Sequence, residues 1–302
     1  MNDQAIVLVT GADGFIGRHL VPYLAAQGYK VFAASRTTAP AFRDPNIVAV
    51  PLPDLSMSFD WQPLLQQCNA VVHLAAIAHI SANDELYDRV NHRATAELAQ
   101  AAFRCGTHLV FMSSVAAQSG SFSDHELTED DPPAPTNAYG RSKLAAERSV
   151  RAAGAPFTIL RPVVIYGDGE KGNFATVHKI ARLPIPLPFG ALTAQRSVLS
   201  VENLNSAIAT ILADPRARGE TFMVSDPAPL TVSDLISRYR ASLGRSPWLI
   251  PFPERWIELS LKSIGQSATW QRIGHTLVAR PTKLLALGWK PHESPSINSK
   301  PT

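Results

Sequence analysis

The sequence predicts an α/β fold in which a doubly wound parallel sheet is followed by a smaller, mixed C-terminal lobe. Short apolar runs alternate with segments of helical periodicity over residues 1–165, as buried parallel strands and their connecting helices do. Beyond residue 166 the alternation loosens, and prolines gather at residues 183–189, which is typical of loops. The chain has 302 residues, of which 45% are hydrophobic, so it is long enough for one such domain and a lobe.

The apolar runs predict the strands in chain order. These strands are expected at residues 5–9, 29–34, 47–50, 70–76, 108–112, 157–160, 198–201 and 221–224. Helices are expected at residues 84–103, 136–150, 201–213, 231–243 and 253–264, and a loop at 168–190. We therefore expect a nucleotide-binding domain over residues 1–165, completed by about 195–225, and a substrate-binding lobe over residues 166–302.

A glycine-rich turn directly follows the first predicted strand and precedes a helical pattern. Strand, turn and helix form the first half of a Rossmann dinucleotide site. Gly11 allows a tight turn, Gly14 a close approach of the pyrophosphate, and Gly17 close packing of the helix. The phosphates then lie at the helix N-terminus, beside Phe15 and Ile16. These five residues are predicted to bind the cofactor.

The second predicted strand ends at Ser35 and Arg36, where an acid would bind the adenosine ribose of NAD. That acid is missing, and an arginine can pair with the 2′-phosphate of NADP. The sequence therefore favours NADP(H) over NAD(H). In the alternative interpretation, Arg36 only stacks on adenine or faces solvent.

Further cofactor contacts are expected where other parallel strands end. They are Asp54, Leu55, Leu74, Ala75, Ala76, Ser113 and Pro162. His73 lies within a predicted strand, and we interpret it as a packed core histidine rather than a ligand.

Tyr139 and Lys143 lie four residues apart in a predicted helix, so both side chains can point at one spot. A phenol has a pKa near 10, and a neighbouring cation favours the phenolate and lowers that pKa. Taken alone, the pair is also compatible with a surface tyrosine and a solvated lysine.

Combined, these motifs resemble the extended short-chain dehydrogenase/reductases of the nucleotide-sugar epimerase/dehydratase family. The chain has the TGxxGxxG opening of that family, a serine, Ser114, about 25 residues before the YxxxK pair, and the LGWKP ending at residues 287–291. The resemblance implies that Tyr139 is the catalytic acid/base, that Lys143 holds the nicotinamide ribose and lowers the tyrosine pKa, and that Ser114 hydrogen-bonds the reacting oxygen.

The resemblance also implies substrate contacts. Arg196 matches an arginine that meets the substrate diphosphate, and Asn91 matches a position that helps to arrange the site. The usual substrate-loop asparagine is Val164 here, so Asn173 is expected to replace it. Ser197 stands where the family has an aspartate after the arginine.

The reaction expected from the resemblance is oxidation or reduction at C4 of a UDP- or dTDP-hexose, in surface polysaccharide biosynthesis. Residues 115–116 are Val-Ala rather than the Asp-Glu pair of 4,6-dehydratases, so dehydration is set aside. A 4-ketoreductase is preferred to a 4-epimerase, because a reductase exchanges its cofactor and NADPH suits that.

Two other functions stay open. A reductase of a non-nucleotide carbonyl, similar to dihydroflavonol or hydroxysteroid reductases, is disfavoured by Arg196 and by residues 171–174. A non-catalytic NAD(P)-binding regulator is disfavoured because Ser114, Tyr139 and Lys143 are all present.

Composition limits the partners. The net charge of +3, without a basic stripe, does not indicate a nucleic-acid groove. Cys68 and Cys105 lack metal-ligand spacing, so no metal site is expected, and both are interpreted as reduced thiols of a cytoplasmic protein. No apolar run is long enough for a membrane span.

Two helices are expected to form subunit contacts if the protein is a homodimer, as the resemblance implies. They lie at residues 84–103 and 137–151. The helix at residues 253–264 has Trp256, Ile257, Leu261 and Ile264 on one side. That pattern favours packing on the lobe or on a partner subunit over a membrane-surface helix.

Overall fold

The sheet of the computed structural model confirms the predicted doubly wound α/β fold. The structure describes residues 4–36, 42–78, 82–169 and 173–292. Seven parallel strands form the sheet in the order β10-β6-β5-β4-β1-β2-β3. They are β1 (Ile6–Thr10), β2 (Lys30–Ser35), β3 (Ile47–Pro51), β4 (Ala70–His73), β5 (His108–Met112), β6 (Phe157–Pro162) and β10 (Thr221–Val224). The observed ends lie close to those predicted, and the order reverses beside β1, where this architecture binds its ligands.

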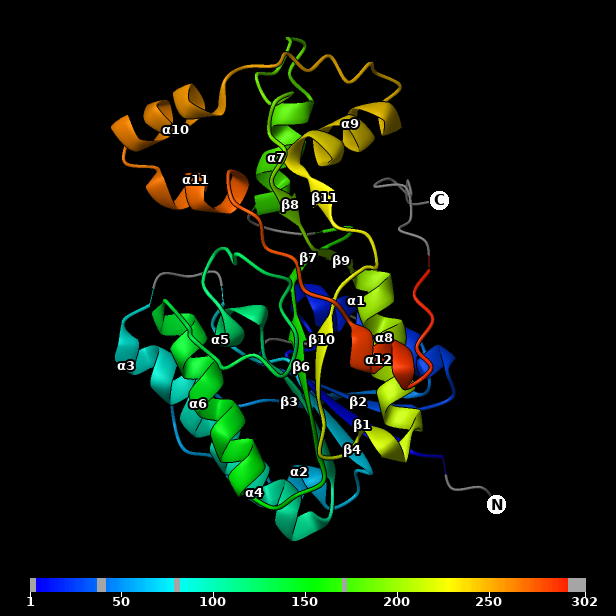
Figure 1. Cartoon of the computed structure of the whole chain (residues 1–302). Helices are drawn as coiled ribbons and strands as arrows, with labels where there is room; N and C mark the ends of the chain where they lie inside the picture. Colours follow the sequence, from blue (N-terminus) through cyan, green and yellow to red (C-terminus); the bar gives the residue numbers. More distant parts are fainter. Residues whose placement is uncertain (1–3, 37–41, 79–81, 170–172, 293–302) are drawn as a thin grey trace.

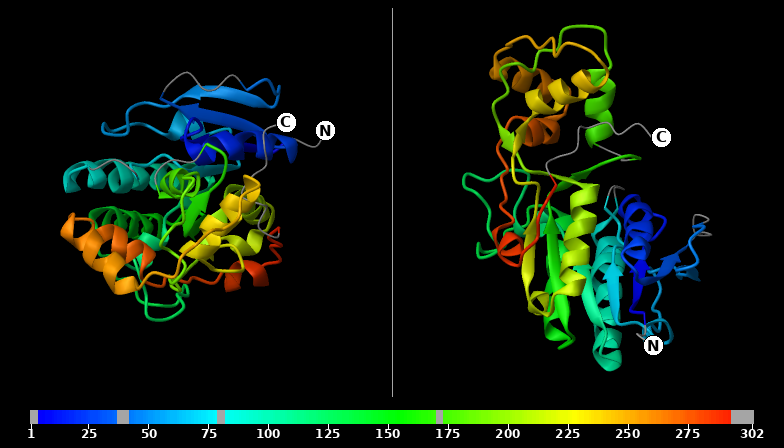
Figure 2. Two further views of the ribbon diagram at one scale, coloured as in Figure 1. Left: turned by 90° about the horizontal axis from the view of Figure 1, so that it is seen from above. Right: turned by 90° about the vertical axis from the view of Figure 1, so that its right-hand side faces the viewer.

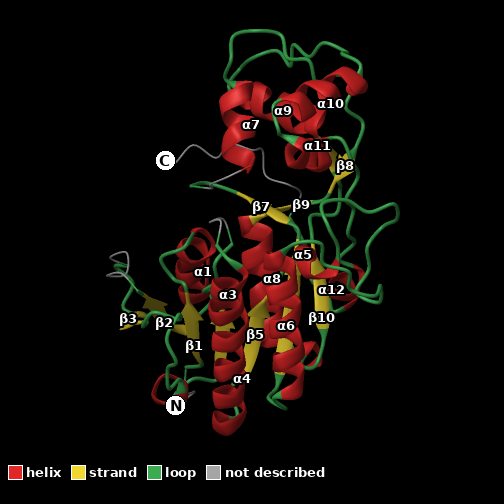
Figure 3. Ribbon diagram, turned by 90° about the vertical axis from the view of Figure 1, so that its left-hand side faces the viewer, coloured by secondary structure: helices red, strands yellow, loops and turns green. Residues whose placement is uncertain are grey.

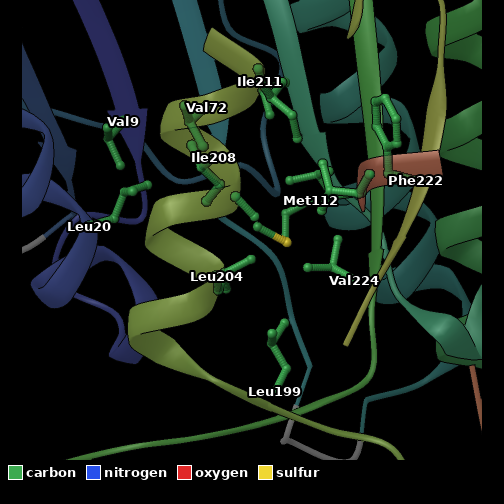
Figure 4. Packing of buried hydrophobic residues seen from close by; sticks show 14 of the residues in the cluster. Val9, Leu20, Val72, Met112, Leu199, Leu204, Ile208, Ile211, Phe222 and Val224 are labelled. Atoms are coloured by element: carbon green, nitrogen blue, oxygen red, sulfur yellow. The ribbon is translucent and has the colours of Figure 1, made fainter. Parts of the chain in front are cut away.

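Helices cover both faces of the sheet because successive strand residues point to opposite sides. On one face, Val7 and Val9 pack with α1 (Phe15–Ala26), α8 (Val201–Ala213) and α12 (Thr282–Ala286). Figure 4 shows Leu204, Ile208 and Ile211 of α8 gathered with Val72 and Met112 in this cluster. The opposite face, which includes Leu8, is covered by α2 (Gln62–Leu65), α4 (Ala94–Cys105) and α6 (Ala138–Ala152).

The predicted helix at residues 84–103 forms, but its middle turn is widened. The segment is α3 (Asp84–Tyr87), a π-helix η1 (Asp88–Arg93) and then α4. Single π-helical turns inside α-helices are often found at functional sites. Here the π-helical turn carries Asn91.

The lobe stands beyond the carboxyl ends of the strands (Figures 1 and 3). It contains α7 (Asn173–Ala181), α9 (Val232–Ser242), α10 (Glu254–Ser263), α11 (Ser267–Ile273) and the paired β8 (Gln195–Arg196) and β11 (Leu230–Thr231). Its own apolar core includes Leu187, Ile236 and Trp270. The prediction of a loop at residues 168–190 was partly wrong, because α7 forms within this segment. The helical residues precede the proline-rich stretch on which the loop prediction rested.

Three short elements join the two parts. They are α5 (Val115–Gln118) after β5, and the parallel pair β7 (Val164–Tyr166) and β9 (Val198–Ser200). The chain finally returns to the sheet, where Leu277, Ala279 and Trp289 enter the same core as α1 and α8. Figure 2 shows this last segment beside α8.

The helix predicted at residues 253–264 packs on the lobe through part of its apolar side. Ile257 is buried and Leu261 packs on the lobe core, but Trp256 and Ile264 are 52% and 69% exposed. A helix this short lays only one row of side chains on the lobe core, so the side chains beside that row face outward.

Two smaller observations bear on partners. None of the described helices combines the length and apolarity needed to cross a bilayer. Cys68 and Cys105 are both free thiols, as predicted.

Candidate active site

The glycine turn has the geometry of a phosphate cradle. Gly11 has φ +71°, a conformation that favours glycine. A Cβ on Gly17 would stand 2.3 Å from the carbonyl oxygen of Gly11, so no side chain fits there. Gly14 is the N-cap of α1 and offers no capping side chain, and the first turn of α1 has no acidic residue. The N-terminal N–H groups of α1 can therefore receive an anion such as a pyrophosphate.

A buried hydrogen-bond chain fixes this turn against β4. The backbone N–H groups of Leu74 and Ala75 donate to the hydroxyl oxygen of Thr10, both at 3.2 Å. Thr10 also bonds Nδ1 of His73 at 2.8 Å, and Nε2 of His73 bonds Thr95 at 3.2 Å. Burial lowers the pKa of His73 to about 3, so the ring is neutral. His73 is thus the packed histidine that was predicted, and it supports the start of the phosphate turn.

The donors and acceptors of these hydrogen bonds are assigned from Thr95, which lies at the far end of the series. Thr95 donates its proton to the carbonyl of Asn91 at 2.8 Å, so it accepts from Nε2–H of His73. Nδ1 of His73 consequently accepts from Thr10. Sequence reasoning missed Thr10 and Thr95 as supporting residues, although the threonine before the first glycine was visible.

The residues expected at the adenosine end lie where β2 and β3 finish. Ser35 is buried and Arg36 is exposed. The carboxyl of Asp54 has a pKa below its usual value because Ser56 hydrogen-bonds to it, with a smaller contribution from the charge of Arg36. Leu55 is buried nearby in the core. Arg36 and Asp54 are therefore near enough to interact, and any 2′-phosphate bound by Arg36 would meet that carboxylate.

Tyr139 occupies the first turn of α6 and is partly buried. Its ring meets the ring of Tyr87 edge-on, with centroids 6.3 Å apart. Burial raises the pKa of Tyr139 to about 12, although a hydrogen bond with the Ser114 side chain acts in the opposite direction. The expected lowering of the tyrosine pKa by Lys143 is therefore not seen: the predicted direction was wrong for this structure.

Lys143, one helical turn after Tyr139 on α6, is not among the groups that shift the pKa of Tyr139. Its ammonium is buried, donates to the carbonyl of Met112 at 2.8 Å and lies 4.9 Å from the centre of the Phe111 ring. Burial lowers the pKa of Lys143 to about 7, against the raising effect of Glu147. A lysine so desolvated is a weak source of positive charge for the phenol at neutral pH.

Ser114 reaches Tyr139 because α5 and α6 pack closely. Ser114 caps α5 and accepts a hydrogen bond from the N–H of Ala116 at 3.1 Å. A Cβ on Gly140 would stand 2.1 Å from the carbonyl oxygen of Ala116. The glycine between Tyr139 and Lys143 is thus required for the approach of the two helices, a signal that sequence reasoning did not use.

A buried ionic network lies beneath these residues. Glu147 is fully buried and accepts hydrogen bonds from Arg161 at 2.9 and 2.6 Å and from Ser113 at 2.6 Å. Burial raises the pKa of Glu147, but these donors outweigh that effect and hold it below its usual value. The hydroxyl of Ser113, predicted to contact the cofactor, is therefore engaged by Glu147. Sequence reasoning missed Glu147, one helical turn after Lys143.

Asn91 holds the segment after β4 against α6. Its side chain bonds the backbone N–H of Ile77 at 2.8 Å and the carbonyl of Ile77 at 2.9 Å. It also donates to Ser142 at 3.2 Å. Asn91 thus links the strand end that carries Leu74, Ala75 and Ala76 with the helix that carries Tyr139.

The predicted substrate residues lie in the lobe, apart from Ser114. Arg196, in β8, donates to the carbonyls of Ser121 at 2.8 Å and His275 at 3.1 Å. Burial lowers its pKa to about 10. Asn173 is the first residue of α7, and its side chain lies outside what the structure describes. Pro162 ends β6 and is buried beside β10.

Among the described residues, no group of three or more histidine, cysteine, aspartate or glutamate side chains is placed to hold a metal ion.

Comparison with known proteins identifies the family and similar folds. Residues 7–225 match the model of the NAD dependent epimerase/dehydratase family. The chain is 32% identical to a UDP-glucose 4-epimerase of Vibrio cholerae, over 95% of this chain and 91% of the relative. It is 27% identical to a ceramide reductase of Caulobacter vibrioides, over 99% of this chain and 90% of that one. A solved structure of MoeE5 with UDP-glucuronic acid and NAD is 25% identical, with a TM-score of 0.74 and coverage of 96% and 95% of the two chains.

Proposed function

The chain belongs to the NAD-dependent epimerase/dehydratase family, and from that premise we propose that it oxidises or reduces C4 of a hexose carried on UDP or dTDP. The observation that carries the proposal is the interaction of Ser114 with Tyr139, together with Lys143, which lies one helical turn after Tyr139 and donates to the Met112 carbonyl at the end of β5. We further propose that the reaction is a 4-ketoreduction, because a reductase exchanges its cofactor and the NADPH favoured by Arg36 at the end of β2 suits that exchange.

A nicotinamide dinucleotide fits the residues around the glycine turn. Its pyrophosphate would lie at the N-terminus of α1, beside Gly11, Gly14 and Gly17, and its adenosine near Asp54 and Leu55. When bound, this cofactor supplies hydride transfer. We propose NADP(H) over NAD(H) because β2 is followed by Arg36, which can pair with a 2′-phosphate, whereas the nearby carboxylate of Asp54 acts against that phosphate.

The protein residues handle the proton. Ser114 and Tyr139 are hydrogen-bonded to one another, so both hydroxyls can hold the same substrate oxygen. A phenol with a pKa of about 12 keeps its proton at neutral pH. Tyr139 can therefore give a proton to a ketone oxygen during reduction, and the same hydroxyl would take the proton back during oxidation.

Two tests address this core of the proposal. Tyr139→Phe should leave cofactor affinity within about twofold while lowering turnover at least 100-fold, because only the proton donor is lost. Near-normal turnover would contradict the assignment. For the cofactor, the ratio of NADPH to NADH affinity should fall in Arg36→Ala; an unchanged ratio would mean that Arg36 does not contact the 2′-phosphate.

Reduction and epimerisation can be distinguished by measuring whether the cofactor is consumed. With a UDP-4-ketohexose, a reductase consumes NADPH, which is followed at 340 nm. An epimerase instead interconverts UDP-glucose and UDP-galactose without net consumption. The name of the Vibrio cholerae relative favours the second outcome, and finding it would replace ketoreduction by epimerisation within the same C4 chemistry.

A second candidate is a reductase of a non-nucleotide carbonyl, because the ceramide reductase matches nearly the whole chain. The bonds from Arg196 to two backbone carbonyls are compatible with it, since they give this arginine a structural role. Arg196→Met should raise KM for a nucleotide sugar at least tenfold if Arg196 binds the diphosphate. An unchanged KM, with normal folding, would favour this second candidate.

The assembly and cellular setting also remain proposals. A homodimer formed through α4 and α6 is testable by sedimentation velocity. The proposed place in surface polysaccharide biosynthesis in the cytoplasm is supported by the sugar-nucleotide chemistry expected of the family and by the two free cysteines.

A further inference from the structure

Loop segments and α10 form the end of the lobe farthest from the sheet (Figures 1 and 3). Several large apolar side chains are exposed on these segments. We define the apolar tip as two loop segments, residues 183–190 and 245–253, together with α10. Its exposed members are Leu183, Ile185, Trp248, Ile250, Phe252, Trp256 and Leu259. Each of these side chains is between 41% and 56% exposed.

The two loops of the apolar tip form one unit. The N–H of Leu187 donates to the carbonyl of Trp248 at 3.1 Å, and the N–H of Ile250 donates to the carbonyl of Leu187 at 2.9 Å. The N–H of Gly190 donates to the carbonyl of Ile250 at 3.0 Å. The apolar side chains are thus held together on one small paired segment and on the helix that directly follows it.

A buried arginine anchors this unit from beneath. Arg240 is 2% exposed, and its guanidinium donates to carbonyls on both loops, among them Leu183 at 2.9 Å, Ile185 at 2.8 Å and Pro247 at 2.9 Å. An arginine fork that satisfies several carbonyls at once fixes a loop in one shape. The exposed apolar side chains therefore lie on loops whose conformation is fixed by hydrogen bonds.

Trp248 has a strained backbone conformation within the apolar tip. It has φ +42° and is the only non-glycine residue with positive φ in the described part of the chain. Bulky side chains rarely adopt this conformation, and such strain persists where surrounding bonds enforce it. Here those bonds place an indole that is 56% exposed at the outer end of the molecule.

The charged side chains of the lobe indicate which kind of partner the apolar tip can bind. Cations adjoin the apolar residues in the chain: Arg182 precedes Leu183, Arg245 lies within the second loop, and Arg255 and Lys262 are on α10; all four are exposed. On α10, Lys262 pairs with Glu258 at 2.6 Å, and the partly buried Glu254 and Glu258 balance the two cations of that helix. Lys179, Arg238 and Arg272 are also exposed in the lobe, where Asp234, Glu254 and Glu258 are the acids of the described helices α7, α9, α10 and α11, so cations are in excess.

We propose that the apolar tip docks on the surface of an anionic lipid bilayer, with Trp248 and Trp256 in the headgroup region. Tryptophan favours that region, and exposed lysines and arginines are attracted to anionic lipids. A second copy of the chain would bring like charges together, and a nucleic acid would leave the apolar side chains uncovered. The inference is independent of the reaction, because it concerns where the enzyme works.

The test is co-sedimentation of the full chain with vesicles of phosphatidylcholine, with and without 30% phosphatidylglycerol, at low and high salt. Wild type should sediment with the anionic vesicles at low salt and be released by high salt. Trp248→Gly removes the indole and also suits the positive φ, so this variant should fold at least as well. It should bind about tenfold more weakly, since an exposed aromatic surface no longer enters the lipid.

Two further variants separate the contributions. Arg255→Gln should weaken binding roughly fivefold and reduce its salt dependence. Met57→Ser removes a side chain that is 69% exposed in the loop after β3, outside the lobe and outside the helices proposed for the homodimer, and should bind like wild type. The proposal is overturned if wild type stays in the supernatant at low salt or if Trp248→Gly sediments as fully as wild type. Loss of self-association in Trp248→Gly, with vesicle binding unchanged, would also overturn it in favour of a second copy.

Discussion

The buried pair of Glu147 and Arg161 offers a direct test of how the site is supported. Glu147→Gln keeps the shape of the side chain but leaves the Arg161 cation, which is 3% exposed, without its negative partner. Removing one partner of a buried ion pair costs about 3–5 kcal/mol, because the other charge stays desolvated. The unfolding entropy scales with chain length, so for 302 residues this corresponds to a fall in Tm of roughly 5–8 °C.

Calorimetry or circular dichroism at pH 7 measures this shift. Glu126→Gln is the matched control, because Glu126 pairs with Arg280 on the surface, where both side chains are more than half exposed. That control should stay within about 1 °C of wild type. The double variant Glu147→Gln/Arg161→Met removes the unpaired cation and should recover part of the loss. A Tm for Glu147→Gln equal to that of the surface control would refute the reasoning.

Three further predictions concern the same region. Gly140→Ala should cost about 1–3 kcal/mol in chemical denaturation, because its Cβ would stand 2.1 Å from the Ala116 carbonyl; an unchanged midpoint would show that α5 and α6 can separate freely. His73 has a pKa of about 3, below that of a free histidine, so between pH 6.5 and 3 only the unfolded state binds its proton. Stability should therefore fall with decreasing pH by about 1.4 kcal/mol per unit from this residue, and a His73→Gln variant should show a shallower slope. Lys143, with a pKa of about 7, should make cofactor-free protein more stable as pH rises from 7 toward 10.5, since the unfolded state holds the extra proton there. Lys143→Met should lack that rise in urea titrations, and an equal rise in both proteins would contradict the buried state of the lysine.

The sheet was predictable because its information is local. The central parallel strands are buried on both faces, so runs such as residues 5–9 and 109–112 are continuously apolar and stand out from their surroundings. The phosphate turn was equally visible, since Gly11 and Gly17 are positions where the backbone admits no side chain. The lobe was harder to predict: α7 lies beside a proline-rich stretch, and α10 exposes part of the apolar side on which the packing prediction rested.

The sequence by itself determined the α/β fold and the glycine turn after β1, and it predicted the set of Ser114, Tyr139 and Lys143, because strand periodicity and motif spacing can be read along the chain. Only the tertiary structure shows how the pKa values of Tyr139 and Lys143 are shifted. Burial and the partners brought in by distant segments determine a pKa, so Tyr139 is shifted to about 12 and Lys143 to about 7. It also revealed the apolar tip, because whether Trp248 is covered or exposed depends on which segments pack around it.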